Sequence, residues 1–258
     1  MVRISAFHVE DPGSIPGRGT HLTIFFICAP RALRAYDLIH MPPPPPQRST
    51  QHIPPVYVFD LDDVLMPTNA LFALPRVRAM LQALNRGDVS QTHAVYRQFV
   101  SHDPLLVHRL GALNGERYLL TNGSQSHAEA ATQALGVYPY LRNIVHAQSG
   151  CGLKPDPGPY TRIEALLRHH YAGDVSLHEP ITLPPIVFFD DRLENLVYPK
   201  RRGWTTVWIP SAHEYHQLHQ GGFRAPPYAD FVFPTVYVAL EYFLMVQRQY
   251  SLGDSHQA

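Results

Sequence analysis

The sequence contains only two cysteines, Cys28 and Cys151, among its 258 residues. So few thiols exclude both a disulfide framework and a zinc site built from several thiolates. The fold must therefore be held together by a hydrophobic core. A chain of this length is sufficient for one domain of medium size with a small insertion.

Long hydrophobic runs are also missing. The best candidate, residues 24–29, is far shorter than the roughly 18 apolar residues that a membrane helix needs, and it ends at Pro30. It lies behind a mixed polar stretch, whereas the apolar core of a secretory signal directly follows a basic start. We therefore expect an intracellular, cytoplasmic protein that has no membrane partner.

An excess of charge is absent as well, because 21 basic side chains balance 21 acidic ones. Such a molecule has no strong field to attract nucleic acid, so nucleic acid is disfavoured as a partner and any phosphate binding has to be local. Lysine is scarce too, since only Lys154 and Lys200 accompany nineteen arginines. A lysine in so arginine-rich a chain indicates that Lys154 supplies a compact point charge.

Proline is concentrated at the N-terminus. Ten of the 25 prolines lie in the first 55 residues, including the run 42–46, and no helical or strand period is sustained there. We expect residues 1–54 to be disordered or loosely packed. Met41, directly before the proline run, is an alternative start. The run itself is either a spacer or a ligand for a polyproline-binding domain.

From Pro55 onward, short runs of apolar and β-branched residues alternate with longer helical stretches. The predicted strands are 56–59, 118–120, 143–145, 186–189 and 205–209, and the helices between them are about 103–113, 125–136, 158–171 and 192–200. This alternation predicts an α/β fold, a Rossmann-like parallel sheet with helices on both faces.

The predicted domain covers residues 55–250 and ends in a helix over 236–250, followed by a flexible tail at 251–258. Two further helices, about 71–85 and 90–101, follow the first strand before the sheet resumes. They predict a small helical cap at about 66–101.

Polar side chains follow several of the predicted strands at their carboxyl ends. A lysine also lies in a loop between two of these strands, just before a predicted helix. These residues are Asp60 and Asp62; Thr121, Asn122 and Gly123; Lys154; and Asp190 and Asp191, with Asn195 shortly after. Each group alone is ordinary turn or helix-cap chemistry. The carboxyl ends of parallel strands meet at one edge of a sheet, however, so together these residues predict one site.

In these four motifs the sequence resembles the haloacid dehalogenase (HAD) superfamily of hydrolases, over about residues 55–245. Within it, the sequence is similar to the pyrimidine 5′-nucleotidase-like phosphatases in all four motifs and in the segment 203–208, and His127-Ala128 in particular resembles that group. A position on a helix surface explains His127 equally well. The predicted cap is shorter than the full helical cap of the family.

The resemblance implies a Mg²⁺-dependent phosphomonoesterase that works through an aspartyl-phosphate. Asp60 would be the nucleophile, and Asp62 would protonate the leaving oxygen and then activate water. The metal would bind the carboxylates of Asp60 and Asp190 and the backbone carbonyl of Asp62, with Asp191 nearby or bound through water. Independently of the resemblance, these four acids cannot all stay ionised at short range without a cation, and hard oxygen ligands favour Mg²⁺.

The resemblance also implies a phosphate-binding set. Thr121 would donate its hydroxyl to a phosphoryl oxygen, assisted by the backbone N–H groups of Asn122 and Gly123. Lys154 would neutralise charge between Asp60 and the phosphoryl group. Family dehalogenases generally lack an acid at the position of Asp62, because a halide needs no proton to leave, so Asp62 favours phosphoryl transfer.

Several alternatives stay open from the sequence. The substrate is expected to be a nucleotide or another small phosphate ester, but a short cap also admits phosphoproteins or nucleic-acid ends. A second subunit could complete the cap, which would make the protein a homodimer. From a different class, the chain could be a catalytically idle member of the fold that binds partners through its proline-rich segment, although every catalytic position is filled.

Overall fold

A computed structural model describes residues 54–83, 89–171, 182–221 and 224–254. The predictions for the proline-rich segment, including Met41 and the proline run, fall outside the described residues except for Pro54.

Six parallel strands form a single sheet in the order β3-β2-β1-β4-β5-β6. The strands are β1 (Val56–Phe59), β2 (Arg117–Leu120), β3 (Asn143–Val145), β4 (Ile186–Asp190), β5 (Thr205–Trp208) and β6 (Phe231–Val232). The predicted α/β fold with a Rossmann-like parallel sheet is confirmed. From β1 the chain adds β2 and β3 on one side of β1, and then crosses to add β4, β5 and β6 on its other side. The strand order therefore reverses between β1 and β4, and open parallel sheets bind ligands at such a point.

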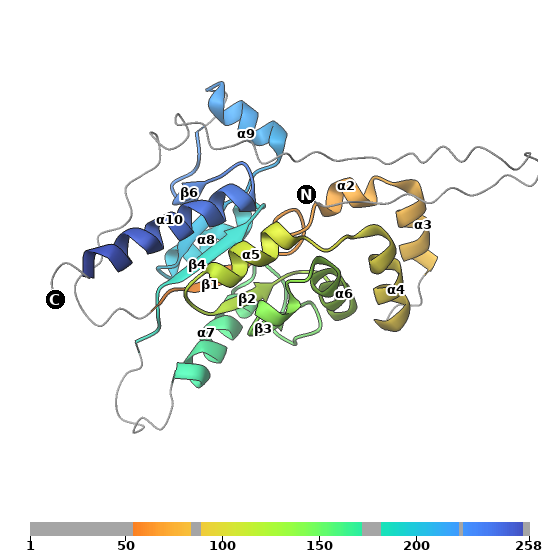
Figure 1. Ribbon diagram of the computed structural model, residues 1–258, viewed down its shortest axis with the longest axis horizontal. Helices are drawn as coiled ribbons and strands as arrows, with labels where there is room; N and C mark the ends of the chain where they lie inside the picture. The colour runs from red at the N-terminus through yellow and green to blue at the C-terminus, as the bar shows by residue number, and fades with distance from the viewer. Residues whose placement is uncertain (1–53, 84–88, 172–181, 222–223, 255–258) are drawn as a thin grey trace, which may run out of the picture.

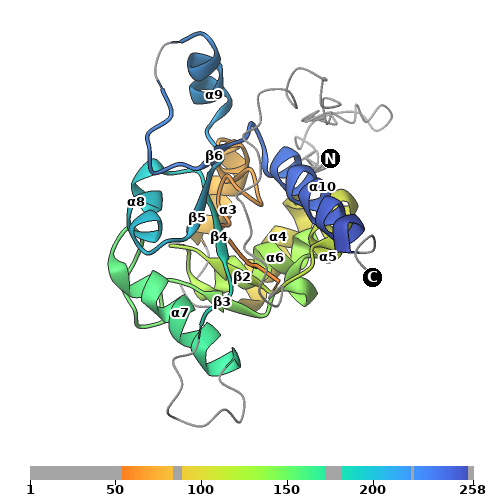
Figure 2. The same cartoon turned by 90° about the vertical axis from the view of Figure 1, so that its left-hand side faces the viewer.

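Helices cover both faces of this sheet, as Figure 2 shows with the sheet between them. They are α5 (Pro104–Ala112), α6 (Gln125–Leu135) and α10 (Val236–Asp254) on one face and α7 (Pro157–Tyr171) and α8 (Leu193–Arg201) on the other. An eight-residue helix, α9 (Ala212–His219), projects beyond the sheet with no buried residue. None of the helices in the described ranges combines the length and apolarity needed to cross a bilayer.

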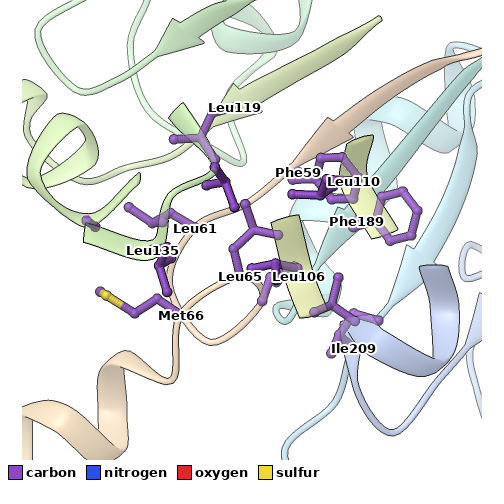
Figure 3. Close-up of a cluster of buried hydrophobic side chains, with 14 of the residues drawn as sticks. Phe59, Leu61, Leu65, Met66, Leu106, Leu110, Leu119, Leu135, Phe189 and Ile209 are labelled. Carbon is purple, nitrogen blue, oxygen red and sulfur yellow. The ribbon is translucent and has the colours of Figure 1, made fainter. Parts of the chain in front are cut away.

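Side-chain alternation along β1 divides the core in two. Tyr57 and Phe59 point into a cluster beneath α5, α6 and α10, whereas Val56 and Val58 point into a second cluster beneath α7 and α8. Every residue of β1 is buried, as expected for a central parallel strand. Figure 3 shows the first cluster, where the rings of Phe59 and Phe189 stack with centroids 4.6 Å apart.

The cap after β1 consists of three short helices, α2 (Thr68–Phe72), α3 (Pro75–Ala83) and α4 (Val89–Phe99). They lie to one side of the sheet in Figure 1, and α4 packs on α6 of the core. The first cap helix was predicted as a single element over 71–85. It is broken because Pro75 has no backbone N–H and disfavours a helical conformation at the residue before it.

The last helix also differs from its predicted length. It continues from Val236 to Asp254, so the first four residues of the expected tail are helical. The final four residues of that tail lie outside the described part of the chain.

Replacing Phe189 by Ala tests whether the stacked pair beneath the strand ends supports the fold. Phe189 is fully buried and directly precedes Asp190, so the cavity should lower the free energy of unfolding by about 3–5 kcal/mol. Urea unfolding measures this loss. Tyr138→Ala removes a ring that is 42% exposed and should cost less than about 0.5 kcal/mol. Equal effects of the two substitutions would contradict the assigned core.

Candidate active site

Asp60 and Asp190 lie side by side because of the strand register. Phe59 of β1 pairs with Phe189 of β4, and the Asp60 backbone N–H donates to the Phe189 carbonyl oxygen over 2.9 Å. The two carboxylates that follow are both buried, with 6% of Asp60 and none of Asp190 exposed. Two negative groups are therefore placed together away from water, an arrangement that needs a compensating cation.

Lys154 supplies that cation. Its ammonium donates to Asp60 Oδ1 over 2.8 Å and to Asp190 Oδ2 over 2.7 Å, and its side chain is 1% exposed. Burial lowers the pKa of Lys154, but the two carboxylates outweigh burial and raise the pKa above its usual value, so the side chain stays charged. Burial raises the pKa of Asp60 well above its usual value; Lys154 opposes this rise and Asp190 adds to it.

Two asparagines hold this ion-paired cluster in place. The Asn122 side chain donates to the Lys154 carbonyl oxygen and accepts from the Lys154 N–H, both over 2.8 Å. Asp190 Oδ1 accepts from the Asn195 side chain and from the Arg192 N–H, both over 2.9 Å. The sequence motif included Asn195, but only the backbone of Asn122 was predicted to act. Its clamp on Lys154 joins two loops distant in sequence, so no local pattern could reveal it.

Thr121 directly follows β2 and is 3% exposed. Its hydroxyl oxygen accepts a 2.9 Å hydrogen bond from the Gly123 N–H. Accepting this bond leaves the hydroxyl hydrogen to donate to a ligand, as predicted for a phosphate-binding threonine. The Gly123 N–H, predicted to be a phosphate donor, is instead engaged within the loop in this structure.

A group of three carboxylates is suited to a metal ion. Asp60, Asp190 and Asp191 each offer one oxygen, and these oxygens lie within 4.8 Å of one another. Burial, with the negative charges of Asp190 and Asp63, raises the pKa of Asp191 to about 7. Three carboxylates against one ammonium leave surplus negative charge, and hard oxygen donors are the ligands that Mg²⁺ prefers, so these residues fit the predicted cofactor.

The carboxylate of Asp62 lies outside that group and is used differently. Its Oδ1 accepts from the Thr68 hydroxyl over 2.6 Å and from His127 Nε2 over 2.8 Å. Burial raises the pKa of Asp62, but His127 and the Thr68 hydroxyl outweigh it and bring the pKa below its usual value. A bound phosphate dianion would place negative charge beside Asp62 and move its pKa back up, toward that of a proton donor.

All the predicted site residues thus occupy one edge of the sheet. Thr68 and Tyr96, which contact Asp62 and His127 respectively, were not predicted. Both come from the cap, and their contacts with Asp62 and His127 depend on how the cap packs on the core.

Comparison with known proteins gives structural likenesses alone. No protein-family model matches the chain, and no curated protein matches it. An L-2-haloacid dehalogenase from Xanthobacter autotrophicus is 17% identical, with a TM-score of 0.44, over 73% of this chain and 98% of its own. CbbY from Rhodobacter sphaeroides, in complex with phosphate, is 17% identical, with a TM-score of 0.48, over 72% and 96%.

A HAD-superfamily hydrolase of subfamily IA from Geobacter sulfurreducens is 12% identical, with a TM-score of 0.45, over 76% of this chain and 99% of its own. Likenesses of this degree concern the fold, and the chemistry of the site depends on its side chains.

Replacing Asp191 by Asn tests the surplus of negative charge. The folded protein without metal holds a proton on Asp191 up to a pKa of about 7, whereas an unfolded chain releases it near 3.8. The wild type should therefore lose stability relative to the variant as the pH rises between these values, and the difference should stay constant above them.

Urea unfolding in a chelator at about pH 5 and about pH 8 measures this difference. The variant should be the more stable protein at the higher pH, and added Mg²⁺ should reverse that order because it binds the wild type more tightly. A variant that is no more stable than the wild type at about pH 8 without metal would contradict the account.

Proposed function

We propose that this chain is a member of the HAD superfamily and acts as a Mg²⁺-dependent phosphomonoesterase on a nucleotide or another small phosphate ester. The observation that carries the proposal is the buried Lys154 ammonium held between Asp60 and Asp190, at the point where the strand order reverses. Thr121 and the second acid, Asp62, follow the strands at the same edge.

Asp60 is the proposed nucleophile. Lys154 and the Leu61 N–H both donate to Asp60 Oδ1 over 2.8 Å, which assigns the attack on phosphorus to Oδ2. The new bond from Oδ2 to phosphorus forms an aspartyl-phosphate while the ester oxygen leaves. Water then attacks phosphorus, restores the Asp60 carboxylate and releases inorganic phosphate.

Asp62 is the proposed acid and base. It donates a proton to the leaving ester oxygen in the first step and takes a proton from the attacking water in the second, so its protonation state is restored after each turnover. A halide would leave without that proton. The presence of Asp62 therefore supports ester hydrolysis over dehalogenation.

The remaining groups stabilise charge. Thr121 and Lys154 are proposed to bind the phosphoryl oxygens as negative charge redistributes. The carboxylates of Asp60, Asp190 and Asp191, with the backbone carbonyl of Asp62, are proposed to hold Mg²⁺. That ion supplies the positive charge needed for an anionic nucleophile to approach a phosphate dianion.

The short cap affects substrate choice. One apolar contact with a leaving group is worth about 1–3 kcal/mol, or about 10–200-fold in kcat/KM, so a cap of three short helices should discriminate weakly among leaving groups. A pyrimidine-nucleotide preference, which the sequence motifs suggest, is therefore expected to be shallow. A homodimer in which a second copy completes the cap would deepen it.

Replacing Asp60 by Asn tests the proposal. It removes the nucleophilic charge with little change of shape, so kcat should fall by at least about a thousandfold while the circular-dichroism spectrum is preserved. The assay uses pyrimidine nucleotides, purine nucleotides and sugar phosphates, each with and without Mg²⁺.

Asp156→Asn is the matched control. It neutralises an exposed carboxylate two residues after Lys154 and should leave kcat unchanged. Turnover of every ester by the Asp60→Asn variant at the wild-type rate would sink the assignment. If the wild type is as active in the presence of a chelator as with Mg²⁺, the proposed dependence on Mg²⁺ is wrong.

A further inference from the structure

Three polar side chains form a continuous connection from the cap to the candidate acid. Tyr96 lies on α4 of the cap, His127 lies on α6 of the core, and Asp62 follows β1. The Tyr96 hydroxyl is hydrogen-bonded to His127 Nδ1, and His127 Nε2 is 2.8 Å from Asp62 Oδ1. The two ring nitrogens thus serve two different partners, one on each side of the junction between cap and core.

The imidazole is held closely in this position. Only 13% of the His127 side chain is exposed, and its ring meets the Tyr96 ring edge-on with centroids 5.5 Å apart. The backbone N–H of His127 donates to the hydroxyl of Ser124, the N-cap residue of α6, over 3.2 Å. A Cβ at Gly123 would lie 2.5 Å from His127 Cδ2, so glycine at that position makes room for the ring.

The partners determine which nitrogen carries the hydrogen. An ionised carboxylate can only accept hydrogen bonds, so Nε2 must donate to Asp62. In a neutral ring Nδ1 is then an acceptor, and its donor is the Tyr96 hydroxyl. Burial raises the pKa of Tyr96 well above its usual value, which keeps that hydroxyl protonated. Asp62 therefore selects the tautomer of His127 that points its N–H at the carboxylate, and the Tyr96 hydroxyl stabilises that tautomer by donating to Nδ1.

Asp62 is anchored through one oxygen. The hydrogen bonds from Thr68 and from His127 both go to Oδ1, which leaves Oδ2 for the proton that the leaving group receives. A carboxyl group held in this way has less rotational freedom to lose when the substrate arrives, which is the origin of the rate advantage of a positioned acid.

Building on the proposed phosphatase activity, we propose that His127 is a positioning residue that holds Asp62 for proton transfer to the leaving group, and that Tyr96 extends this control to the cap. His127 acts through Asp62 and does not contact the substrate. The cap thus supplies a hydroxyl that orients the acid.

A purely structural role for His127 makes a different prediction. If the ring only fastened α4 to α6, its loss would slow every substrate by the same factor. A positioning role instead affects the proton transfer, on which esters with poor leaving groups depend far more than activated aryl phosphates do. The two substrate classes therefore separate the two roles.

The test uses the full chain with Mg²⁺, an alkyl phosphate such as a 5′-nucleotide, and 4-nitrophenyl phosphate. His127→Ala should lower kcat/KM, which reports the first phosphoryl transfer and not the shared water attack, by at least about tenfold for the alkyl ester and by less than about threefold for the aryl ester. His127→Gln keeps an N–H donor within reach of Asp62 and should recover most of the loss. Tyr96→Phe should show the same selectivity with a smaller loss.

Two substitutions serve as controls. His108→Ala removes an exposed histidine from α5, and Tyr138→Phe removes the hydroxyl of a ring that is 42% exposed. Neither should change the ratio of the two rates. Equal losses on both esters in His127→Ala, or no loss on either, would overturn the positioning role.

A spectroscopic measurement is independent of turnover. In ¹⁵N spectra at about pH 8, the His127 ring, assigned by its absence in His127→Gln, should carry its proton on Nε2, and the proton should stay there in Tyr96→Phe because Asp62 still requires a donor. A proton on Nδ1 would overturn the inference. If the wild type hydrolyses neither ester, the proposed function fails, and the ¹⁵N result decides by itself whether His127 holds Asp62.

Discussion

The buried ion pairs of Lys154 are the interaction on which the rest of the site depends. The parallel register of β1 and β4 places Asp60 beside Asp190, and only an ammonium at 2.8 Å and 2.7 Å makes that pairing tolerable inside the protein. Removing one member of such a buried group leaves an uncompensated charge, at a cost of about 3–5 kcal/mol. Asn122 holds the lysine and Asn195 holds Asp190, so side-chain hydrogen bonds also tie the loops to the cluster.

One ammonium does not neutralise three carboxylates, and this imbalance connects stability to function. Burial and the neighbouring carboxylates, which together raise the pKa of Asp191 to about 7, weaken the folded protein without metal, and the same carboxylates create an affinity for a hard cation. The excess negative charge of the three carboxylates would be offset by a bound cation, and in the proposed reaction that cation would also let a phosphate dianion approach a carboxylate. Local destabilisation is thus a direct consequence of the chemistry proposed for this site.

The sequence predicted β1 to β5 and the set of acids because both are local signals: three of the apolar runs are followed by a polar residue, and parallel strands bring those ends together. The break at Pro75 could also have been read from the chain. The clamp of Asn122 on Lys154 and the connection from Tyr96 through His127 to Asp62 could not, because they join segments far apart in sequence. They exist only once the loops and the cap have packed, and they decide how the predicted residues are oriented.

Trapping the covalent intermediate tests the central claim most directly. The protein is mixed with a phosphate ester and Mg²⁺, quenched in acid within one turnover, digested and analysed by mass spectrometry. The account predicts one acid-stable, hydroxylamine-sensitive phosphoryl group on Asp60, which accumulates further when Asp62 is replaced by Asn because the water attack then lacks its base. Turnover without any phosphorylated peptide, or with the phosphoryl group on another residue, would contradict it.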